Sequence, residues 1–443
     1  MKFDISIIIL SAGKGTRMNS SKAKVLHEIS GKPMLYYSIY EAMKLSCDIH
    51  VVLYHQANDI KKTMHKYFDK TSINYHIQDH ENYPGTGGAV MGINTKYKQT
   101  LVLNGDMPLI KAEELKSLTI KNKEVINISY MTLKDASGYG RVVIKNDKVE
   151  KIVEQKDCST KELDINKANA GVYCFQTEFL KYSLKKLNNN NAQQEYYITD
   201  LVAIAINENN TVKATKVSEQ NFKGVNSKYD LSQALDIHQN NIKKNFMLQG
   251  VTMYLPQTIY IENGVQIDAE TILENGVSLL GDSKIINSHI KSNSQIDNSV
   301  IKNSTIGPMA RVRPNCDIQQ SNIGNFVEVK NSQLNKVKAG HLSYIGDSFV
   351  DTGTNIGAGT ITCNYDGINK HKTTIGKNVF IGSGCQIIAP IKIEDNCIVG
   401  AGSQITKDIK DGELVLNRAE TKTIKNYFYK YFKIVSKKDK DAK

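Results

Sequence analysis

The sequence of 443 residues is 40% hydrophobic and 23% charged, ordinary values for a soluble globular protein, and its length favours two domains over one core. Its net charge of +12 is compatible with nucleic acid, a membrane surface or anionic small molecules as partners. No apolar run is long enough to span a bilayer, and the seven scattered cysteines suggest neither a disulfide framework nor a zinc site.

Short β-branched runs alternate with helical stretches in the first half of the chain. We expect buried strands at residues 5–10, 49–53, 100–103 and 125–131, and helices at residues 33–45, 57–67 and 112–119. The apolar start is short, contains Asp4 and leads into a glycine loop, so we interpret it as a strand of a cytoplasmic protein rather than a signal peptide. The alternation predicts an α/β, Rossmann-like domain whose ligands bind at the carboxyl ends of the strands.

A glycine loop, Gly13-Lys14-Gly15-Thr16-Arg17, follows the first expected strand. Its two glycines let the backbone approach phosphates closely, and the arginine adds a fixed positive charge. The loop is neither a Walker A motif nor a full dinucleotide-binding motif, and alone it could be an ordinary turn. Lys24, which precedes an aliphatic pair, makes a phosphate site the favoured interpretation over a solvated surface lysine.

A second polar motif, Asn104-Gly105-Asp106, ends a β-branched strand. A carboxylate at such a strand end is well placed to bind Mg²⁺, which prefers oxygen ligands, although Asp106 could be only a helix cap. Together with the glycine loop and Lys24, this motif resembles the signature of the sugar-1-phosphate nucleotidyltransferases. The resemblance implies that residues 1–227 form a pyrophosphorylase domain that uses UTP and Mg²⁺.

The resemblance also implies roles for single residues in this domain. Arg17 and Lys24 would grip the triphosphate, and Asn226 would share the Mg²⁺ ion with Asp106. The residues implied to bind UTP or the sugar nucleotide are Leu10, Ala12, Gly13, Arg17, Lys24, Gln78, Gly85, Thr86, Gly140, Glu154, Asn169, Thr199 and Asn226. Ala23 and Ala170 stand where the family usually has proline and threonine, and the segment from Gln78 to Gly85 is longer than in the family.

The second half of the chain follows a period of six residues. Aliphatic residues recur at this spacing, with glycine, asparagine, serine and aspartate between them: Ile261, Ile267, Leu273, Leu279 and Ile285; Ile306, Val312 and Ile318; and Ile375, Ile381, Ile387, Ile393, Val399 and Ile405. This period drifts around an α-helix but suits a parallel β-coil in which each short strand sends one aliphatic side chain inward. We predict a β-helix over residues 249–418, a helical linker at residues 228–248 and a basic tail at residues 419–443.

The register of six breaks once, between Ile356 and Ile375, which are nineteen residues apart. A loop added to a solenoid is a common place for function, and residues 362–371 lie in this gap. This loop and the runs at residues 311–314, 325–330 and 338–347 resemble the acetyltransferase signature of the bifunctional N-acetylglucosamine-1-phosphate uridylyltransferase / glucosamine-1-phosphate acetyltransferase family. The resemblance covers both halves of the chain. It implies a left-handed parallel β-helix of hexapeptide repeats, a homotrimer, and acetylation by acetyl-CoA before uridylyl transfer.

Roles in the second half follow from the same resemblance. His341 would be the general base that takes a proton from the glucosamine amine, since the pKa of an imidazole lies near neutrality, and Glu328 would orient or polarise it. The residues implied for the glucosamine phosphate are Arg313, Lys330, Tyr344, Asn355 and Lys370, and those implied for acetyl-CoA are Asn364, Tyr365, Ser383, Ala401 and Arg418. The alternative for His341 is a polar residue at a corner of the solenoid.

The basic tail holds eight lysines against three acidic residues. A solvated, partly disordered tail is the favoured interpretation, while the aromatic residues 427–432 could instead form a short docking or membrane-touching helix. For the whole chain we expect small-molecule substrates, no nucleic acid and no integral membrane segment.

Two other functions stay open at this point. The chain could be a scaffold without activity, or a pyrophosphorylase for another sugar whose β-helix only oligomerises. The set Arg17, Lys24, Asp106, Asn226 and His341 argues against a scaffold, because a scaffold does not need these residues. His341 and the run at residues 364–367 argue against a single activity.

Overall fold

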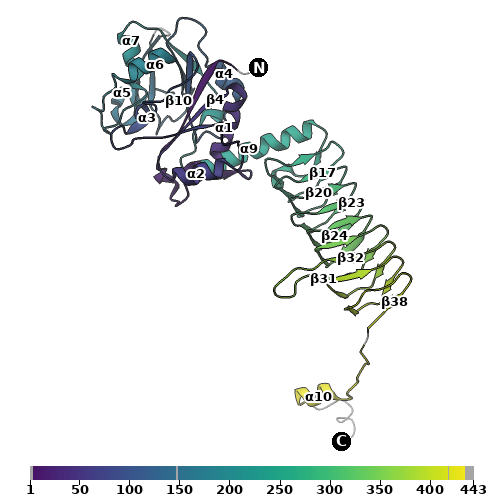
Figure 1. Ribbon diagram of the computed structural model, residues 1–443. Coiled ribbons are helices and arrows are strands. Elements are labelled where there is room, and N and C mark those ends of the chain that lie inside the picture. Colours follow the sequence, from purple (N-terminus) through teal and green to yellow (C-terminus); the bar gives the residue numbers. More distant parts are fainter. Residues whose placement is uncertain (1–2, 146–147, 418, 435–443) are drawn as a thin grey trace. The chain divides into compact units, whose positions relative to one another are not determined.

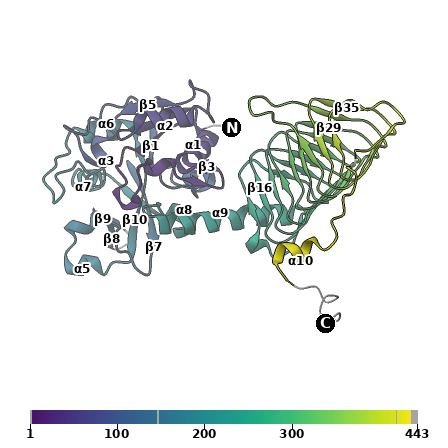
Figure 2. The same ribbon diagram turned by 90° about the horizontal axis from the view of Figure 1, so that it is seen from below.

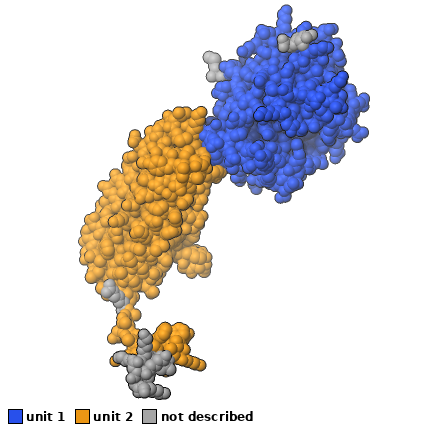
Figure 3. All heavy atoms as spheres, turned by 180° about the vertical axis from the view of Figure 1, so that it is seen from behind, with its two compact units in different colours: residues 1–242 blue, residues 243–443 orange. Residues whose placement is uncertain are grey.

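The computed structural model describes residues 3–145, 148–417 and 419–434 (Figure 1). The chain divides into two compact units, residues 1–242 and 243–443, which Figure 3 colours separately. Within the described ranges, no helix is both long enough and apolar enough to cross a membrane.

A mixed sheet of nine strands forms the centre of the first unit (Figures 1 and 2). The strands are β1 (Ile5–Ser11), β4 (Asp48–Leu53), β5 (Asn74–Ile77), β6 (Gln99–Asn104), β7 (Ile126–Thr132), β8 (Arg141–Lys145), β9 (Lys148–Val153), β10 (Lys167–Gln176) and β11 (Val212–Lys216). Their main order is β11-β7-β10-β6-β1-β4-β5, and β8 and β9 form a hairpin attached to β10. β1 is parallel to both β4 and β6, whereas β10 runs antiparallel between β6 and β7.

Helices cover both faces of this sheet. They are α1 (Met34–Leu45), α2 (Ala57–Met64), α3 (Gly85–Gly88), α4 (Ala112–Ser117), α5 (Thr160–Leu163), α6 (Thr177–Leu184), α7 (Asp200–Asn207) and α8 (Glu219–Phe222), and a small hairpin is formed by β2 (Glu28–Ile29) and β3 (Lys32–Pro33). The long helix α9 (Lys228–Leu248) packs its first turns against α1 and this hairpin. Ile7 and Ile9 pack in one core cluster and Ile8 in another, as the alternation of a strand requires. A continuous aliphatic run therefore forms a strand buried on both faces, and the predicted α/β fold is confirmed.

The second unit is a left-handed parallel β-helix with three sheets, one on each side of the coil (Figure 2). One sheet holds β12 (Thr252–Met253), β15 (Ile272–Leu273), β18 (His289–Ile290), β21 (Thr305–Ile306), β24 (Asn322–Asn325), β27 (Lys338–His341), β30 (Asn355–Ile356), β33 (Phe380–Ile381), β36 (Ile398–Val399) and β38 (Leu414–Val415). The next holds β13 (Tyr260–Ile261), β16 (Ser278–Leu280), β19 (Gln295–Asp297), β22 (Arg311–Val312), β25 (Glu328–Lys330), β28 (Tyr344–Gly346), β31 (Ile361–Cys363), β34 (Gln386–Ile388) and β37 (Gln404–Ile405). The third holds β14 (Gln266–Ile267), β17 (Lys284–Ile286), β20 (Val300–Lys302), β23 (Asp317–Gln319), β26 (Gln333–Asn335), β29 (Ser348–Val350), β32 (Thr373–Ile375) and β35 (Ile391–Ile393).

The corners of the coil come in two lengths, so the prediction of a single break in the register of six is wrong. Successive inward aliphatics such as Ile285 and Ile290 are five residues apart, and the second residue after the first aliphatic is left-handed, with φ between 41° and 50°. Seven corners follow this rule, with Asn287, Asn298, Asn303, Gln320, Asn331, Lys336 and Asp347 as the left-handed residue. At longer corners whose left-handed residue is not glycine, such as Ile290 to Ile296, that residue is the third, here Asn293.

The long gap between Ile356 and Ile375 holds the predicted loop. It leaves the coil after β31 and returns at β32, and Figure 1 shows it projecting from the stack beside β31. After the last strand, β38, the described chain continues to α10 (Tyr427–Phe432).

Candidate active sites

A cavity of about 390 Å³ opens at the carboxyl ends of β1 and β6, the position that the sheet order predicts for a ligand. The predicted nucleotide-binding residues that line it are Leu10, Ala12, Gly13, Lys24, Gln78, Gly85 and Thr86, together with the predicted metal ligand Asp106. Residues from three separate stretches of sequence therefore meet at one cavity.

Lys24 stands at the centre of the polar contacts in this region. Its Nζ lies 2.5 Å from Oδ2 of Asp106 and 3.1 Å from Oδ1 of Asn226. Arg17 donates a second hydrogen bond of 2.9 Å to the same Asn226 oxygen. Two oxygen ligands and two cationic groups that are far apart in the sequence thus converge on one point.

The backbone fixes Asn226 opposite Asp106. The amide of Val225 donates to the carbonyl of Asp106 at 2.9 Å, and Gly224 lies so close that a Cβ there would be 3.3 Å from the Asp106 carboxylate. Asp230 accepts hydrogen bonds from the backbone amides of Asn226 and Ser227 at 3.1 and 2.9 Å, at the start of α9. The first backbone amides of a helix have no hydrogen-bond partner within the helix, and the Asp230 carboxylate supplies one here. These hydrogen bonds hold the backbone of Asn226 in place.

Two glycines permit the close packing around the glycine loop. Gly15 has φ of 61°, and a Cβ on it would lie 2.6 Å from the Cβ of Lys24. A Cβ on Gly105 would lie 2.1 Å from Oγ of Ser11, a buried hydroxyl that has no hydrogen-bond partner in the described structure. Ser11 lines the cavity but was not among the predicted residues, because a serine at a strand end carries no signal of its own.

Gln78 holds the expected base-binding loop. Its Nε2 donates to the carbonyls of Tyr83 and Gly85 at 2.9 and 3.0 Å, and its side chain is buried. Gly85 has φ of 92°, where other residues are strained, and Thr86 accepts a hydrogen bond from the amide of Ile198. The side chain of Gln78 therefore links the two ends of the segment between Gln78 and Gly85 through hydrogen bonds.

The residues predicted for the sugar side form a separate group of contacts. Thr199 donates to Glu154 at 3.1 Å, and burial raises the pKa of the Glu154 carboxyl. The backbone amide of Asn169 donates a hydrogen bond to the carbonyl of Gly140 at 2.8 Å. The side-chain Nδ2 of Asn169 donates to the hydroxyl of Tyr173. These four predicted residues are therefore linked in pairs.

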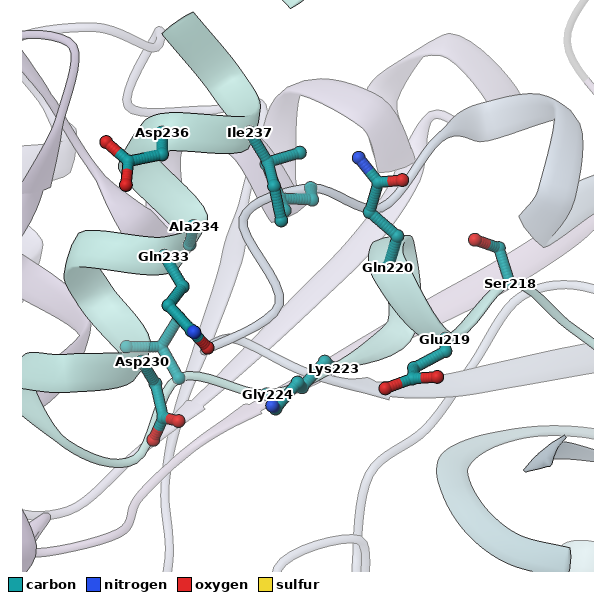
Figure 4. Close-up of a pocket in the computed structure, with 12 residues that line it drawn as sticks. Ser218, Glu219, Gln220, Lys223, Gly224, Asp230, Gln233, Ala234, Asp236 and Ile237 are labelled. Carbon is teal, nitrogen blue, oxygen red and sulfur yellow. The ribbon is translucent and has the colours of Figure 1, made fainter. Parts of the chain in front are cut away.

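Two further cavities flank the segment that carries Asn226. One of about 270 Å³ is lined by Arg17, Tyr139 and Asn226. The other, of about 670 Å³, lies between α8 and the first turns of α9 and is lined by Gln220, Gln233 and Asp236 among others (Figure 4). The larger cavity was not predicted, because most of its lining side chains come from α8 and α9, which carry no motif.

Four of the five predicted phosphate-binding residues of the second unit gather on one outer face of the β-helix. Arg313, which directly follows β22, donates to Oε1 of Glu328 on the neighbouring strand β25 at 2.9 Å. The ammonium of Lys370 lies beside Lys330 and lowers the pKa of Lys330. Arg313, Lys330 and Lys370 thus bring three positive charges to one surface, which also holds the carboxylates of Glu328 and Asp347. Glu328, which we expected to orient or polarise His341, forms an ion pair with Arg313 instead.

Tyr344 belongs to the same face. It pairs with Glu328 in the sheet, and its ring covers Gly346, where a Cβ would be 2.5 Å from the tyrosine hydroxyl. Asn355 lies on another of the three sheets, between Lys338 and Phe380, so within the chain it is not part of this cluster.

His341 stands at a corner of the coil and is exposed. The corners of successive coils stack above one another through backbone hydrogen bonds, from Leu342 to Asn325, from Gly359 to His341, from Gly384 to Ala358 and from Gly402 to Ser383. This corner column contains Asn325, His341, Ala358, Ser383 and Ala401. The predicted base and two predicted acetyl-CoA residues therefore share one edge of the β-helix.

The projecting loop is organised by Asp366. Its Oδ1 accepts hydrogen bonds from the amides of Ile368 and Asn369 at 2.8 and 2.6 Å, and its Oδ2 lies 2.6 Å from Nε2 of His371. These contacts lower the pKa of the Asp366 carboxyl. Tyr365 forms an antiparallel bridge with Lys370 across the loop and is exposed.

Asn364 begins this loop and is buried. Its Nδ2 donates to Oδ2 of Asp347, whose Oδ1 accepts from Asn331 at 2.5 Å. Sequence reasoning assigned no role to Asp347, although it lies within the acetyltransferase signature, because the signature does not show what this carboxylate contacts. Arg418, predicted for acetyl-CoA, lies outside the described residues.

Comparison with known proteins covers both units. A model of the nucleotidyl transferase family matches residues 6–223, and a model of bacterial transferase hexapeptide repeats matches residues 372–407. A bifunctional protein GlmU from Aliarcobacter butzleri is 62% identical over 427 residues, covering 96% of this chain and 98% of that protein. Proteins of the same name from Nitratiruptor sp. and Campylobacter jejuni are 55% and 51% identical, with 96% of this chain and 99% of each relative covered.

Identity at this level extends from the glycine loop through the β-helix, so the resemblance inferred from the motifs is confirmed. The same finding removes the scaffold and the single-activity pyrophosphorylase as alternatives. The chain belongs to the bifunctional GlmU family and is an enzyme with both a uridylyltransferase and a glucosamine-1-phosphate acetyltransferase activity.

Proposed function

We propose that residues 1–227 perform the uridylyl transfer through Arg17, Lys24, Asp106 and Asn226. The observation that carries this assignment is the position of Lys24 Nζ, 2.5 Å from Asp106 and 3.1 Å from Asn226 at the nucleotide cavity. A phosphate oxygen of N-acetylglucosamine-1-phosphate attacks the α-phosphorus of UTP in line, and pyrophosphate leaves. Arg17 and Lys24 align the reactants and offset the negative charge that accumulates at phosphorus.

The residues present fit a Mg²⁺ ion. The oxygen atoms of Asp106 and Asn226 both contact the ammonium group of Lys24, and this supports a shared position for a single cation. In the described part of the chain no three His, Cys, Asp or Glu side chains meet as a complete metal cage. Mg²⁺ commonly takes one or two protein ligands plus substrate phosphates, so this sparse set suits it. When bound, Mg²⁺ would neutralise phosphate charge.

We assign the acetyl transfer to residues 249–418, with His341 as the general base. The glucosamine nitrogen attacks the thioester carbonyl of acetyl-CoA, His341 takes a proton from that nitrogen, and the carbon–sulfur bond breaks to release CoA. Arg313, Lys330, Tyr344 and Lys370 would hold the sugar phosphate. Ser383 and Ala401, on the corner column of His341, and Asn364 and Tyr365 of the loop would line the acetyl-CoA site, with Arg418 completing it.

We further propose that the β-helix assembles as a homotrimer through an apolar ridge next to His341. Met309, Phe326 and Leu342 occupy equivalent corners of successive coils, with φ of 52° to 55° and exposed fractions of 46%, 56% and 63%. A left-handed conformation costs about 1 kcal/mol or more for such residues, and exposed large side chains gain nothing from it. Burial of the ridge against another copy would offset this cost and would bring residues such as Asn355 of a second copy near His341.

A two-step assay tests these assignments. Protein given glucosamine-1-phosphate, acetyl-CoA, UTP and Mg²⁺, the substrates of a cytoplasmic reaction, should release CoA thiol first and pyrophosphate second. His341→Ala should abolish thiol release and leave uridylyl transfer from N-acetylglucosamine-1-phosphate nearly intact, while Asp106→Asn should do the reverse. If either variant, correctly folded, lost both activities, the two sites would not be independent.

The assembly has its own test. Replacing Phe326 and Leu342 with serine should convert the trimer to a monomer in sedimentation velocity and lower thiol release, whereas the exposed Phe349 of β29, on the sheet that does not border the ridge, should tolerate serine. A wild-type chain that sediments as a monomer at micromolar concentration would disprove the proposal.

A further inference from the structure

Asn226, the proposed partner of Asp106 at the Mg²⁺ position, lies on a connecting segment. It stands between the end of α8 at Phe222 and the start of α9 at Lys228. A metal site loses affinity when one of its ligands is free to turn away, so a ligand on such a segment depends on the groups that fix it.

The side-chain amide of Asn226 has a defined orientation. Its Oδ1 accepts hydrogen bonds from Arg17 at 2.9 Å and from Lys24 at 3.1 Å, while its Nδ2 donates to the carbonyl of Gly224 at 3.4 Å. The nitrogen is thus turned toward the backbone and the oxygen toward the cationic groups. A metal ligand needs this orientation, because Mg²⁺ binds oxygen.

The side chain of Asp230 fixes the backbone that carries this amide. Its Oδ2 accepts hydrogen bonds from the backbone amides of Asn226 and Ser227 at 3.1 and 2.9 Å, and from Oγ of Ser227 at 2.8 Å. Ser227 Oγ in turn accepts a hydrogen bond from the amide of Asp230 at 3.1 Å. A serine before a helix and an acidic residue three positions later form such a reciprocal cap, so α9 starts at a defined residue.

This cap extends one residue further than a capping box requires. In a capping box the acidic side chain binds the amide of the N-cap residue, here Ser227, whereas Asp230 also binds the amide of Asn226. On the other side of Asn226, the amide of Val225 donates to the carbonyl of Asp106 at 2.9 Å. The backbone of Asn226 is therefore held between the start of α9 and the loop that carries Asp106.

The negative charge of Asp230 also acts on this region. Burial raises the pKa of Tyr139 to about 12, and the charges of Asp230 and Asp106 add to the rise. Tyr139, Asn226 and Asp230 line the same cavity of about 270 Å³, and Asp230 lines the neighbouring cavity of Figure 4 as well. A carboxylate at this place favours a cation nearby.

We propose that Asp230 is a positioning residue of the uridylyltransferase site, which holds Asn226 where its side-chain oxygen can share a cation with Asp106. The inference rests on the proposed function, in which Asp106 and Asn226 bind Mg²⁺. Asp230 acts through the backbone of Asn226. Without its carboxylate one side of the segment is released, the oxygen of Asn226 spends less time beside Asp106, and the affinity for the cation falls.

Binding of Mn²⁺ in the absence of nucleotide tests the proposal. Electron paramagnetic resonance of the unbound ion should show that Asp230→Ala binds Mn²⁺ about tenfold more weakly than the wild type. Asp230→Asn keeps an acceptor oxygen and should bind Mn²⁺ more tightly than Asp230→Ala. Glu162→Ala is the matched control, because it removes the carboxylate from the capping box of Ser159 at the start of α5 and should leave Mn²⁺ binding unchanged.

The Mg²⁺ dependence of turnover gives a second measurement. The Mg²⁺ concentration for half-maximal pyrophosphate release should rise about tenfold in Asp230→Ala, and the rate should approach that of the wild type when Mg²⁺ is saturating. A variant that had only lost folded protein would not recover in this way. Acetyl transfer by Asp230→Ala should equal that of the wild type, since the residues assigned to it lie in the second unit.

Asp106→Asn separates this inference from the proposed function. Wild-type Mn²⁺ binding by Asp106→Asn would overturn the assignment of the metal site and the role of Asp230 with it. Loss of binding in Asp106→Asn together with wild-type binding by Asp230→Ala would overturn the role of Asp230 alone.

Two further results would also overturn it. Equally weak Mn²⁺ binding by Asp230→Ala and Glu162→Ala would show that the loss of any helix cap in this unit has the same effect. Equally weak binding by Asp230→Asn and Asp230→Ala would show that the charge of Asp230 matters and its hydrogen bonds to the segment do not.

Discussion

Lys24 and Asp106 are separated by 82 positions in the sequence, yet the lysine Nζ lies 2.5 Å from the aspartate Oδ2. Both side chains are only 15% exposed, so water screens this ion pair less than it would a surface pair. The ammonium group therefore occupies the position from which a cation could bind the carboxylate.

This contact predicts opposite effects of one substitution on metal binding and on turnover. Lys24→Met should strengthen Mn²⁺ binding in the absence of UTP about tenfold, because a competing positive charge is removed. The same variant should lower the rate of pyrophosphate release by about 10² to 10³, because a charge that stabilises the transition state is lost. Calorimetry with Mn²⁺ and a phosphate-release assay measure the two effects. Weaker Mn²⁺ binding by Lys24→Met would contradict the competition.

Two glycines in neighbouring coils make a matched pair for stability. A Cβ on Gly324 would lie 1.9 Å from the carbonyl oxygen of Gly340, whereas a Cβ on Gly340 would meet nothing within 4 Å. Gly324→Ala should therefore destabilise the β-helix by about 1–3 kcal/mol, and Gly340→Ala by less than about 0.5 kcal/mol. Urea unfolding followed by circular dichroism measures the difference, and equal effects would show that the coils adjust freely.

His238 gives the first unit a dependence on pH. Burial lowers the pKa of His238 to about 4, and its Nδ1 lies 2.9 Å from Oγ of Ser30, which itself accepts a hydrogen bond from Gln239. The serine proton is then directed at Nδ1, so the imidazole is held neutral. Because the pKa of an unfolded histidine is about 6.5, the unfolded chain takes up a proton first as the pH falls, and stability is lost between about 6.5 and 4.

The size of this loss follows from the pKa difference, and amounts to about 3 kcal/mol once the pH is below the folded-state pKa. His238→Asn should remove most of this slope while lowering the stability at neutral pH. Thermal unfolding of both proteins across this pH range measures the effect. If the wild type and the variant lost stability in parallel, another group would be responsible.

Asp366 is expected to control the affinity for acetyl-CoA without taking part in the reaction. Asp366→Ala removes the acceptor for two loop amides and for His371, so Asn364 and Tyr365 should lose their positions. We expect the KM for acetyl-CoA to rise about tenfold, with a smaller change in kcat, since the loop binds rather than reacts. Lys372→Ala, just after the loop, is the control. A loss of kcat with an unchanged KM would place the loop in the chemical step instead.

The sequence predicted the elements that have a strong period or a motif. The strands at residues 5–10 and 49–53 are present as β1 and β4, because continuous β-branched runs have no other stable placement than a sheet buried on both faces. The helix at residues 33–45 is present as α1. The chain between Lys24 and Asp106 carries no local signal of their contact, since that contact depends on the order of the strands.

The corners of the β-helix show the limit of the period. Lys336 and Gln320 adopt the left-handed conformation although neither residue prefers it. Their conformation is imposed by the coils above and below, whose backbone hydrogen bonds fix where each corner turns. The ion pair of Glu328 with Arg313 could not be predicted from the signature either. It arises because successive coils place β25 next to β22.

The two lengths of corner also bear on how such a chain can vary. A corner that moves its left-handed residue from the third to the second position after an aliphatic shortens the coil by one residue, and the next aliphatic still points inward. Single-residue deletions at corners therefore leave the stack of strands intact, whereas a deletion within a strand would turn every following side chain to the wrong side. We expect homologous chains to differ in length mainly at these corners and in the loop between β31 and β32, where length does not alter the core.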